Sequence, residues 1–179
     1  MNHRLQLVVR VTLACLLLHG RAIRIADRAD PPLEFHPTRQ YRSAIMARGY
    51  VVRTLKGYSA AELNAIRAAA AVQNPIEPPV LEHAAALAYR ATGREALWMP
   101  RLMSVLAWVL GALGAWGLVV ARRDSGANAP RAVAGLVAVA VYLFLPFGRP
   151  ASQAFQPDAL MTALAVVAVA AVAWRQRTP

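Results

Sequence analysis

Apolar residues are grouped into four runs, and a long polar segment separates the first run from the other three. The runs cover residues 5–20, 102–121, 132–147 and 159–174 and contain few charged side chains. A helix needs about 20 predominantly apolar residues to cross a bilayer, and somewhat shorter runs also span. The pattern therefore predicts an all-α protein, a multi-pass transmembrane helical bundle with about four spans, and one module over residues 1–179.

The first run has two interpretations, because Arg10 interrupts it and few residues precede it. A cleaved signal peptide and an uncleaved transmembrane helix both fit. A signal peptide ends in small residues at an A-x-A-like site, and the segment His19-Gly20-Arg21-Ala22 matches such a site poorly. We therefore favour the uncleaved helix. Its single cysteine, Cys15, is expected to be a small buried hydrophobic residue.

The polar segment at residues 21–100 shows helical patterns of its own. We expect one helix capped by Thr38 and ending near Gly57, a second opened by a Ser59–Glu62 capping box, and a third that follows Pro78-Pro79 and stops at Gly93. Arginines on their polar sides are typical of helices that lie on a membrane surface. The segment is thus predicted to be an outer loop with amphipathic surface helices. A small soluble helical subdomain is the alternative.

Composition and charge also favour a membrane protein. Of 179 residues, 58% are hydrophobic and only 16% are charged, whereas a soluble domain has about 25% charged residues. The net charge of +11 indicates contact with anions. Because the basic residues flank apolar runs, membrane lipids are the expected partners and nucleic acid is not.

The charges of the short loops predict the orientation of the chain. The turn at residues 122–131 carries three arginines and one aspartate, whereas the loop at residues 148–158 carries one of each. Basic short loops stay in the cytoplasm. Both termini are therefore expected in the cytoplasm, and residues 21–100 are expected on the outer face of the membrane, together with the loop at residues 148–158.

Carboxylates lie beside arginines on this predicted outer face. A carboxylate at a membrane interface can act as a general base, and nearby arginines can neutralise a departing phosphate. The alternative is that the carboxylates only offset local positive charge. The sequence contains no Gly-rich phosphate loop, no metal-spaced cysteine pair and no H-E-x-x-H motif. No cofactor is therefore expected, and the need for a divalent cation is left open.

Four segments occur in an order that suggests a family. They are residues 30–44, the proline-led segment Glu77–Glu82, the helix entry Gly93–Leu102 and the loop Ser152–Asp158. In this order the chain resembles the N-terminal part of bacterial GT-C fold, family 39-like integral membrane glycosyltransferases. That group includes protein O-mannosyltransferases and the aminoarabinose transferase that acts on lipid A.

The resemblance implies an inverting transfer of a sugar from a polyprenyl-phosphate donor to a lipid, glycan or protein acceptor, on the outer face of the bacterial inner membrane. It assigns acceptor activation to Asp30, with Asp27 as the second candidate, and another acidic position to Asp158. The candidate substrate-binding residues are Arg39, Arg42, Arg101, Glu34 and His36. Members of that family continue through further spans, so the chain would be an N-terminal part. The alternative is a non-catalytic small multi-pass membrane protein, either a subunit or a truncated remnant.

Overall fold

The computed structural model describes residues 3–26, 31, 33, 35–54, 56–120 and 128–176. The described residues form eight α-helices and no strand, so the all-α prediction is confirmed. In chain order the helices are α1 (His3–Ile25), α2 (Pro37–Val51), α3 (Ala60–Ala71), α4 (Val80–Thr92), α5 (Trp98–Val120), α6 (Asn128–Phe144), α7 (Gly148–Gln153) and α8 (Asp158–Arg175).

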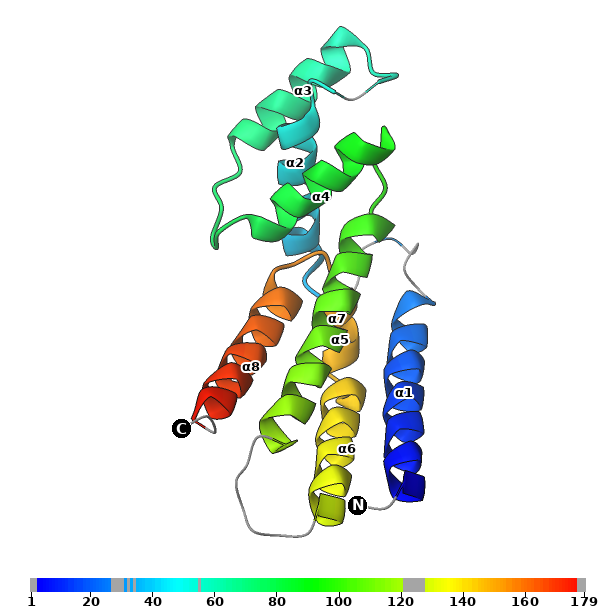
Figure 1. Ribbon diagram of the computed structural model, residues 1–179. Helices are drawn as coiled ribbons and strands as arrows, with labels where there is room; N and C mark the ends of the chain where they lie inside the picture. Colours follow the sequence, from blue (N-terminus) through cyan, green and yellow to red (C-terminus); the bar gives the residue numbers. More distant parts are fainter. Residues whose placement is uncertain are drawn as a thin grey trace.

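Helices α1, α5, α6 and α8 form an elongated bundle with α5 in contact with each of the others (Figure 1). Among the described residues, three of these helices, α1, α5 and α8, are long and apolar enough to cross a membrane. Helix α6 has 17 residues and is shorter. The chain is therefore a helical protein with three candidate membrane-spanning helices.

Small residues let α5 approach its neighbours closely. A Cβ atom added at Gly111 would lie 3.2 Å from the Cα atom of Ala163, and one at Gly114 would lie 3.0 Å from a side-chain carbon of Val167. Both distances are tighter than most real Cβ contacts. Small residues at helix interfaces permit close helix packing, and these two glycines lie at such close approaches. At Gly117 a Cβ atom would make only ordinary contacts.

Helices α2, α3 and α4 form a separate layer beyond the N-terminal end of α5 (Figure 1). The layer is packed onto the bundle through a shared apolar core, whose buried members are Ala47, Val51, Leu81, Ala85, Ala86, Tyr89, Met99 and Phe155. Met99 belongs to α5 and Phe155 to the segment before α8. Burial of these side chains holds the layer in a fixed position on the bundle.

Local signals place several helix ends correctly. Ser59 accepts a hydrogen bond from the backbone N–H of Glu62, and Glu62 accepts one from the backbone of Ser59, so the predicted capping box is present at the start of α3. Gly93 ends α4 with a left-handed φ of 68°. Only glycine adopts such a conformation without steric cost, which explains why α4 stops there as predicted.

The predicted bounds of α2 are wrong at both ends. The helix begins at Pro37, with His36 as the N-cap residue, so Thr38 lies inside the helix and caps nothing. A proline suits the first helical position, because its fixed φ is helical and its missing N–H is not needed there. The helix ends at Val51, well before Gly57.

Helices α1 and α7 also differ from expectation. Helix α1 extends to Ile25, beyond the predicted end at residue 20, and the additional residues include Arg24, which is buried against the bundle. Cys15 is exposed, so the prediction of a buried thiol is wrong. Leu13, Leu16 and Leu17 face the bundle core instead, and Cys15 lies outside that face. The short helix α7 occupies residues 148–153, which were expected to be a loop.

Candidate functional site

Two segments far apart in the sequence meet where the α2–α4 layer joins the bundle. The side-chain amide of Gln156 donates to the carbonyl of Phe35 at 2.7 Å, and that of Gln40 donates to the same carbonyl at 3.2 Å. The backbone N–H of Phe155 donates to Gln40 Oε1 at 3.2 Å. Both glutamine side chains are buried, where hydrogen bonds are costly to leave unmade. These bonds fix the start of α2 against the segment that leads into α8.

The backbone is strained at this contact. Phe35 and His36 both have positive φ, 46° and 56°, which is uncommon for residues other than glycine. The Phe35 ring packs edge-on against Phe147 with 5.2 Å between ring centroids, and its carbonyl accepts the two amide bonds. Strain of this kind persists only where surrounding contacts impose it, and it concentrates at functional sites.

Arg39, in the first turn of α2, lies within reach of two carboxylates from other segments. Its guanidinium lies 2.6 Å from Glu77 Oε1 and 3.6 Å from Asp158 Oδ2. Asp158 is the first residue of α8, where the helix dipole favours a negative charge. All three side chains are about one-third exposed. Ion pairs with such exposure add about 0–1 kcal/mol of stability, so fold stability alone explains little of this arrangement.

A small cavity with a volume of ≈ 20 Å³ lies beside this cluster. Its wall includes Arg39, Arg42, Ser43, Glu77 and Glu82. Arg42 is partly buried and forms no hydrogen bond or ion pair with the described residues. Its guanidinium is therefore available to an anionic ligand, and guanidinium groups bind phosphate in bidentate fashion.

Glu82 contributes a buried carboxylate to the same cavity. Glu82 is 5% exposed, and the Ser43 hydroxyl donates a hydrogen bond to Glu82 Oε1 at 2.7 Å. Its Oε2 is buried and accepts no hydrogen bond from the described residues. The sequence analysis placed Glu82 in the proline-led segment but gave it no role. Helical spacing could have predicted that Glu82 is buried. The residues three, four and seven places later, Ala85, Ala86 and Tyr89, are apolar and buried, so Glu82 lies on the same face of α4.

Arg24, near the end of α1, forms hydrogen bonds that fix α7 and the residues that lead from it to Asp158. Its side chain is fully buried at the end of α1. It donates to the Ser152 hydroxyl at 2.6 Å, to the Gly20 carbonyl at 2.7 Å and to the Leu143 carbonyl. The Gln153 amide donates back to the Arg24 carbonyl at 2.9 Å. Through these bonds α1 fixes α7, and with it the segment that ends at Asp158.

Two residues of α2, Tyr50 and Arg48, have pKa values raised above their ordinary values. Partial burial, and then the negative charge of Glu82, raises the pKa of the Tyr50 phenol. Tyr50 also stacks on His83 at 4.1 Å between ring centroids. Burial lowers the pKa of Arg48, but its hydrogen bond and Coulomb attraction to Glu95 outweigh burial and raise that pKa above its ordinary value. Arg48 therefore stays charged and ties α2 to the turn before α5.

The residues predicted from the sequence have different outcomes. Arg39 and Asp158 are in contact, and Arg42 lines the same cavity. Arg101 is buried in the first turn of α5 and is not part of the cavity wall. The side chain of His36 is exposed and contacts the Phe35 ring. Three predicted residues, Asp27, Asp30 and Glu34, lie outside the described residues, and their assignments stay predictions.

Neither a search for metal ligands nor comparison with known proteins assigns a role to the site. Within the described ranges, no group of three or more His, Cys, Asp or Glu side chains is placed to hold a metal ion. No family model, curated protein or solved structure matches the chain. The interpretation of the site therefore rests on its own residues.

Proposed function

We propose that the chain is the N-terminal part of a GT-C fold, family 39-like membrane glycosyltransferase that moves a sugar from a polyprenyl-phosphate donor to an acceptor. The observation that carries the proposal is the cavity lined by α2, α4 and the segments that precede α4 and α8, with Arg42 in its wall and Arg39 in contact with Asp158. Fixed guanidinium groups stabilise the negative charge that develops on a leaving phosphate. Asp158, in contact with Arg39, is suited to orient that guanidinium.

The arrangement of helices supports four spans with the site on one face. Helix α6 has 17 residues, which gives a length of about 26 Å at about 1.5 Å per residue. That is close to the thickness of a bilayer hydrocarbon core, about 27–30 Å. We assign α6 as the fourth span and the α2–α4 layer as surface helices on the outer face of the bacterial inner membrane.

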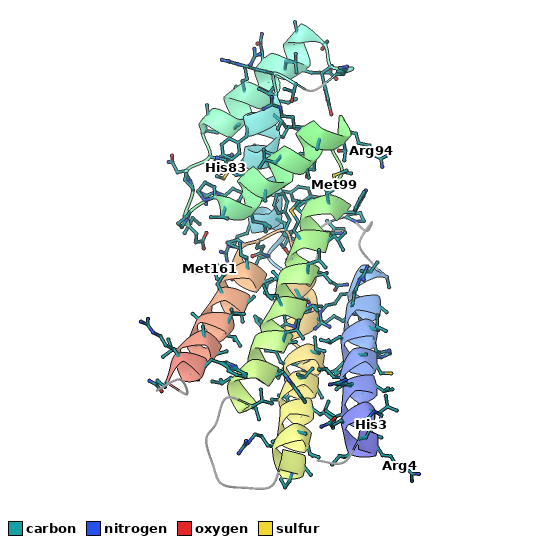
Figure 2. All side chains as sticks on the ribbon, viewed as in Figure 1. His3, Arg4, His83, Arg94, Met99 and Met161 are labelled. Carbon is teal, nitrogen blue, oxygen red and sulfur yellow. The ribbon has the colours of Figure 1, made fainter. Side chains whose placement is uncertain are left out.

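The position of the two chain ends supports the proposed orientation. The start of α1 and the end of α8 both lie at the end of the bundle away from the α2–α4 layer (Figure 1). His3 and Arg4 are at that end of α1, whereas His83 and Arg94 are in the layer (Figure 2). Basic residues near short loops and helix ends favour the cytoplasm. We assign both ends to the cytoplasmic side.

The proposed reaction is a single displacement at the anomeric carbon. An acceptor hydroxyl or amine attacks this carbon and passes its proton to a carboxylate, which we assign to Asp30, with Asp27 as the second candidate. The bond from the anomeric carbon to the phosphate oxygen breaks, and polyprenyl phosphate leaves with both bonding electrons. Arg39 and Arg42 bind that phosphate, and Asp158 orients Arg39. Roles for Glu34, His36 and Arg101 in substrate binding remain part of the proposal.

The test uses the full chain in lipid nanodiscs. Binding of undecaprenyl phosphate is measured for wild type, Arg42→Gln and the control Arg90→Gln, which changes an exposed arginine on α4. We expect Arg42→Gln to weaken binding about tenfold or more and the control to leave it unchanged. No binding by wild type rejects the proposed function.

The catalytic assignment needs a second measurement, because binding alone does not report on the base. Sugar transfer from undecaprenyl-phosphate mannose is compared between wild type and Asp30→Asn, with any downstream coding sequence restored. Loss of a general base lowers the rate by about 10²–10⁴-fold. Undiminished transfer in Asp30→Asn and in Asp27→Asn would refute the assignment of the base.

A second candidate function is a non-catalytic membrane subunit. It is favoured by the size of the cavity, ≈ 20 Å³, which suits one water-sized group rather than a whole sugar. In that case the full chain crosslinks to a partner protein in membranes and binds neither undecaprenyl phosphate nor its mannose derivative. A chain that binds both lipids as a monomer contradicts this alternative.

A further inference from the structure

Glu82 is the one buried carboxylate among the described acidic residues. A buried carboxylate normally has a cationic partner or a full set of hydrogen-bond donors. Glu82 forms no ion pair within the described part of the chain, and its Oε2 accepts no hydrogen bond there. Ser43 satisfies only Oε1, at 2.7 Å. The fold therefore keeps an acceptor oxygen that it does not itself use.

The charges around the cavity restrict what can satisfy that oxygen. Arg39 and Ser43 are four residues apart on α2 and line the same cavity, with Arg42 beside them. Residues four apart lie on the same face of a helix. Glu77 neutralises Arg39 at 2.6 Å, so Arg42 and Glu82 are the two lining charges without an ionic partner among the described residues. A ligand that suits both carries a negative group and a separate hydrogen-bond donor, as a sugar phosphate does.

The size of the cavity indicates which part of such a ligand enters it. A volume of ≈ 20 Å³ accepts one hydroxyl or amino group. A larger cavity of ≈ 280 Å³ lies next to it and shares Met46 and Pro75 in its wall. Its wall also includes the aromatic ring of Tyr50. The larger cavity has room for a sugar ring, one substituent of which reaches the smaller cavity.

We propose that Glu82, positioned by Ser43, binds a hydroxyl or amino substituent of the donor sugar and so selects a sugar-bearing polyprenyl phosphate over the bare lipid phosphate. This inference rests on the proposed function, because it assumes that the phosphate lies at Arg39 and Arg42. The substituent donates its hydrogen to Oε2. No covalent change at Glu82 is involved.

The experiment compares two lipids that differ only in the sugar. Binding of undecaprenyl phosphate and of undecaprenyl-phosphate mannose to the full chain in nanodiscs is measured for wild type and for Glu82→Gln. We expect Glu82→Gln to weaken binding of the mannose lipid about tenfold or more, as for loss of one charged hydrogen bond. Binding of the bare lipid phosphate changes by less than about twofold. Arg42→Gln weakens both, and the control Arg90→Gln, which changes an exposed arginine on α4, weakens neither.

The outcomes separate this inference from the proposed function. If wild type binds neither lipid, the proposed function fails and the inference fails with it. If wild type binds both lipids and Glu82→Gln affects neither, or both equally, the role of Glu82 is overturned while the proposed function stands. A third arm uses soluble mannose 1-phosphate. Equally tight binding there overturns the lipid-linked ligand in favour of a soluble sugar phosphate.

Folding of the variants is checked by thermal unfolding. Glu82→Gln should unfold at the wild-type temperature or above it, because Oε2 has no partner to lose in the unliganded protein. If this variant does not fold, Ser43→Ala takes its place. It removes the hydroxyl that orients Glu82 and should reduce the preference for the mannose lipid about threefold. An unchanged preference in Ser43→Ala overturns the inference.

Discussion

The hydrogen bond from Arg24 to Ser152 can be tested as the contact that holds the candidate site in place. Arg24 Nε donates to the Ser152 hydroxyl at 2.6 Å, and both residues are fully buried. We consider the double-mutant cycle formed by Arg24→Met and Ser152→Ala. Methionine keeps much of the length of the arginine stem and removes the charge, and alanine removes only the hydroxyl.

The size of the coupling follows from the contacts of Arg24. In Ser152→Ala the other two acceptors, the carbonyls of Gly20 and Leu143, remain, so the guanidinium stays in place and its Nε–H loses its partner. A hydrogen bond from a charged group contributes about 1.5–3 kcal/mol in soluble proteins. Interhelical hydrogen bonds in a membrane protein average about 0.6 and reach about 1.7 kcal/mol. We therefore expect a coupling energy of about 1–2 kcal/mol.

The measurement is equilibrium unfolding in mixed micelles, followed by tryptophan fluorescence. Trp108 is a suitable reporter, because the Arg24 guanidinium lies 6.0 Å from its ring centroid. The matched control is Ser104→Ala. Ser104 is also fully buried, but its hydroxyl donates to Pro100 in its own helix at 3.3 Å.

The control should show no coupling to Arg24→Met beyond about 0.5 kcal/mol, the usual error of additivity. A coupling below about 0.5 kcal/mol between Arg24 and Ser152 would show that α7 is held by packing rather than by this bond. A comparable coupling for Ser104 would show that Arg24→Met disturbs the whole bundle. Either result contradicts the role given to Arg24.

Three further changes test other parts of the fold. Gly111→Val should lower the free energy of unfolding by about 1–3 kcal/mol in chemical denaturation, because the added carbons collide with the Tyr142 ring of α6 and press on the backbone of α8. Hydrogen bonds from the Ser59 backbone and side chain lower the pKa of Glu62 from 4.5, so their stabilisation of α3 is present above that pH and is lost as pH falls through the folded pKa. An NMR titration should show the Glu62 pKa returning toward 4.5 in Ser59→Ala, and an unchanged value contradicts the capping box. Glu95→Gln should destabilise the α2–α4 layer by about 1 kcal/mol, less at high salt, through loss of the 2.6 Å ion pair with Arg48; thermal unfolding that is independent of salt in wild type argues against it.

Features that depend on neighbouring residues could be predicted from the sequence. The capping box at Ser59 and the stop at Gly93 each involve residues a few positions apart, so the chain around them determines the backbone. The apolar runs likewise located α5 and α8 to within a few residues. Helix α7 was missed because the polar residues between two apolar runs were assigned to a loop; Pro150 does not prevent a helix there, since proline is tolerated in the first turn.

Features that depend on distant residues were predicted less completely. The carboxylate Asp158 and the arginines Arg39 and Arg42 were named from charge and expected location, but no local pattern states that Arg39 contacts both Glu77 and Asp158. Arg24 had no assigned role, since its hydrogen-bond partner Ser152 lies in another part of the chain. Such contacts follow from tertiary packing, which periodicity does not encode.

The hydrogen bonds of Arg24 also order the events of biosynthesis. The residues that accept from it outside α1, Leu143 and Ser152, follow it by 119 and 128 positions. At about 5–20 residues per second, the ribosome needs roughly 6–26 s to reach the second of them. During that interval α1 carries a guanidinium with only its own helix to satisfy it. The N-terminal helix therefore reaches its final packing against the bundle only after α6 and α7 have been made, and assembly of the candidate site is a late step.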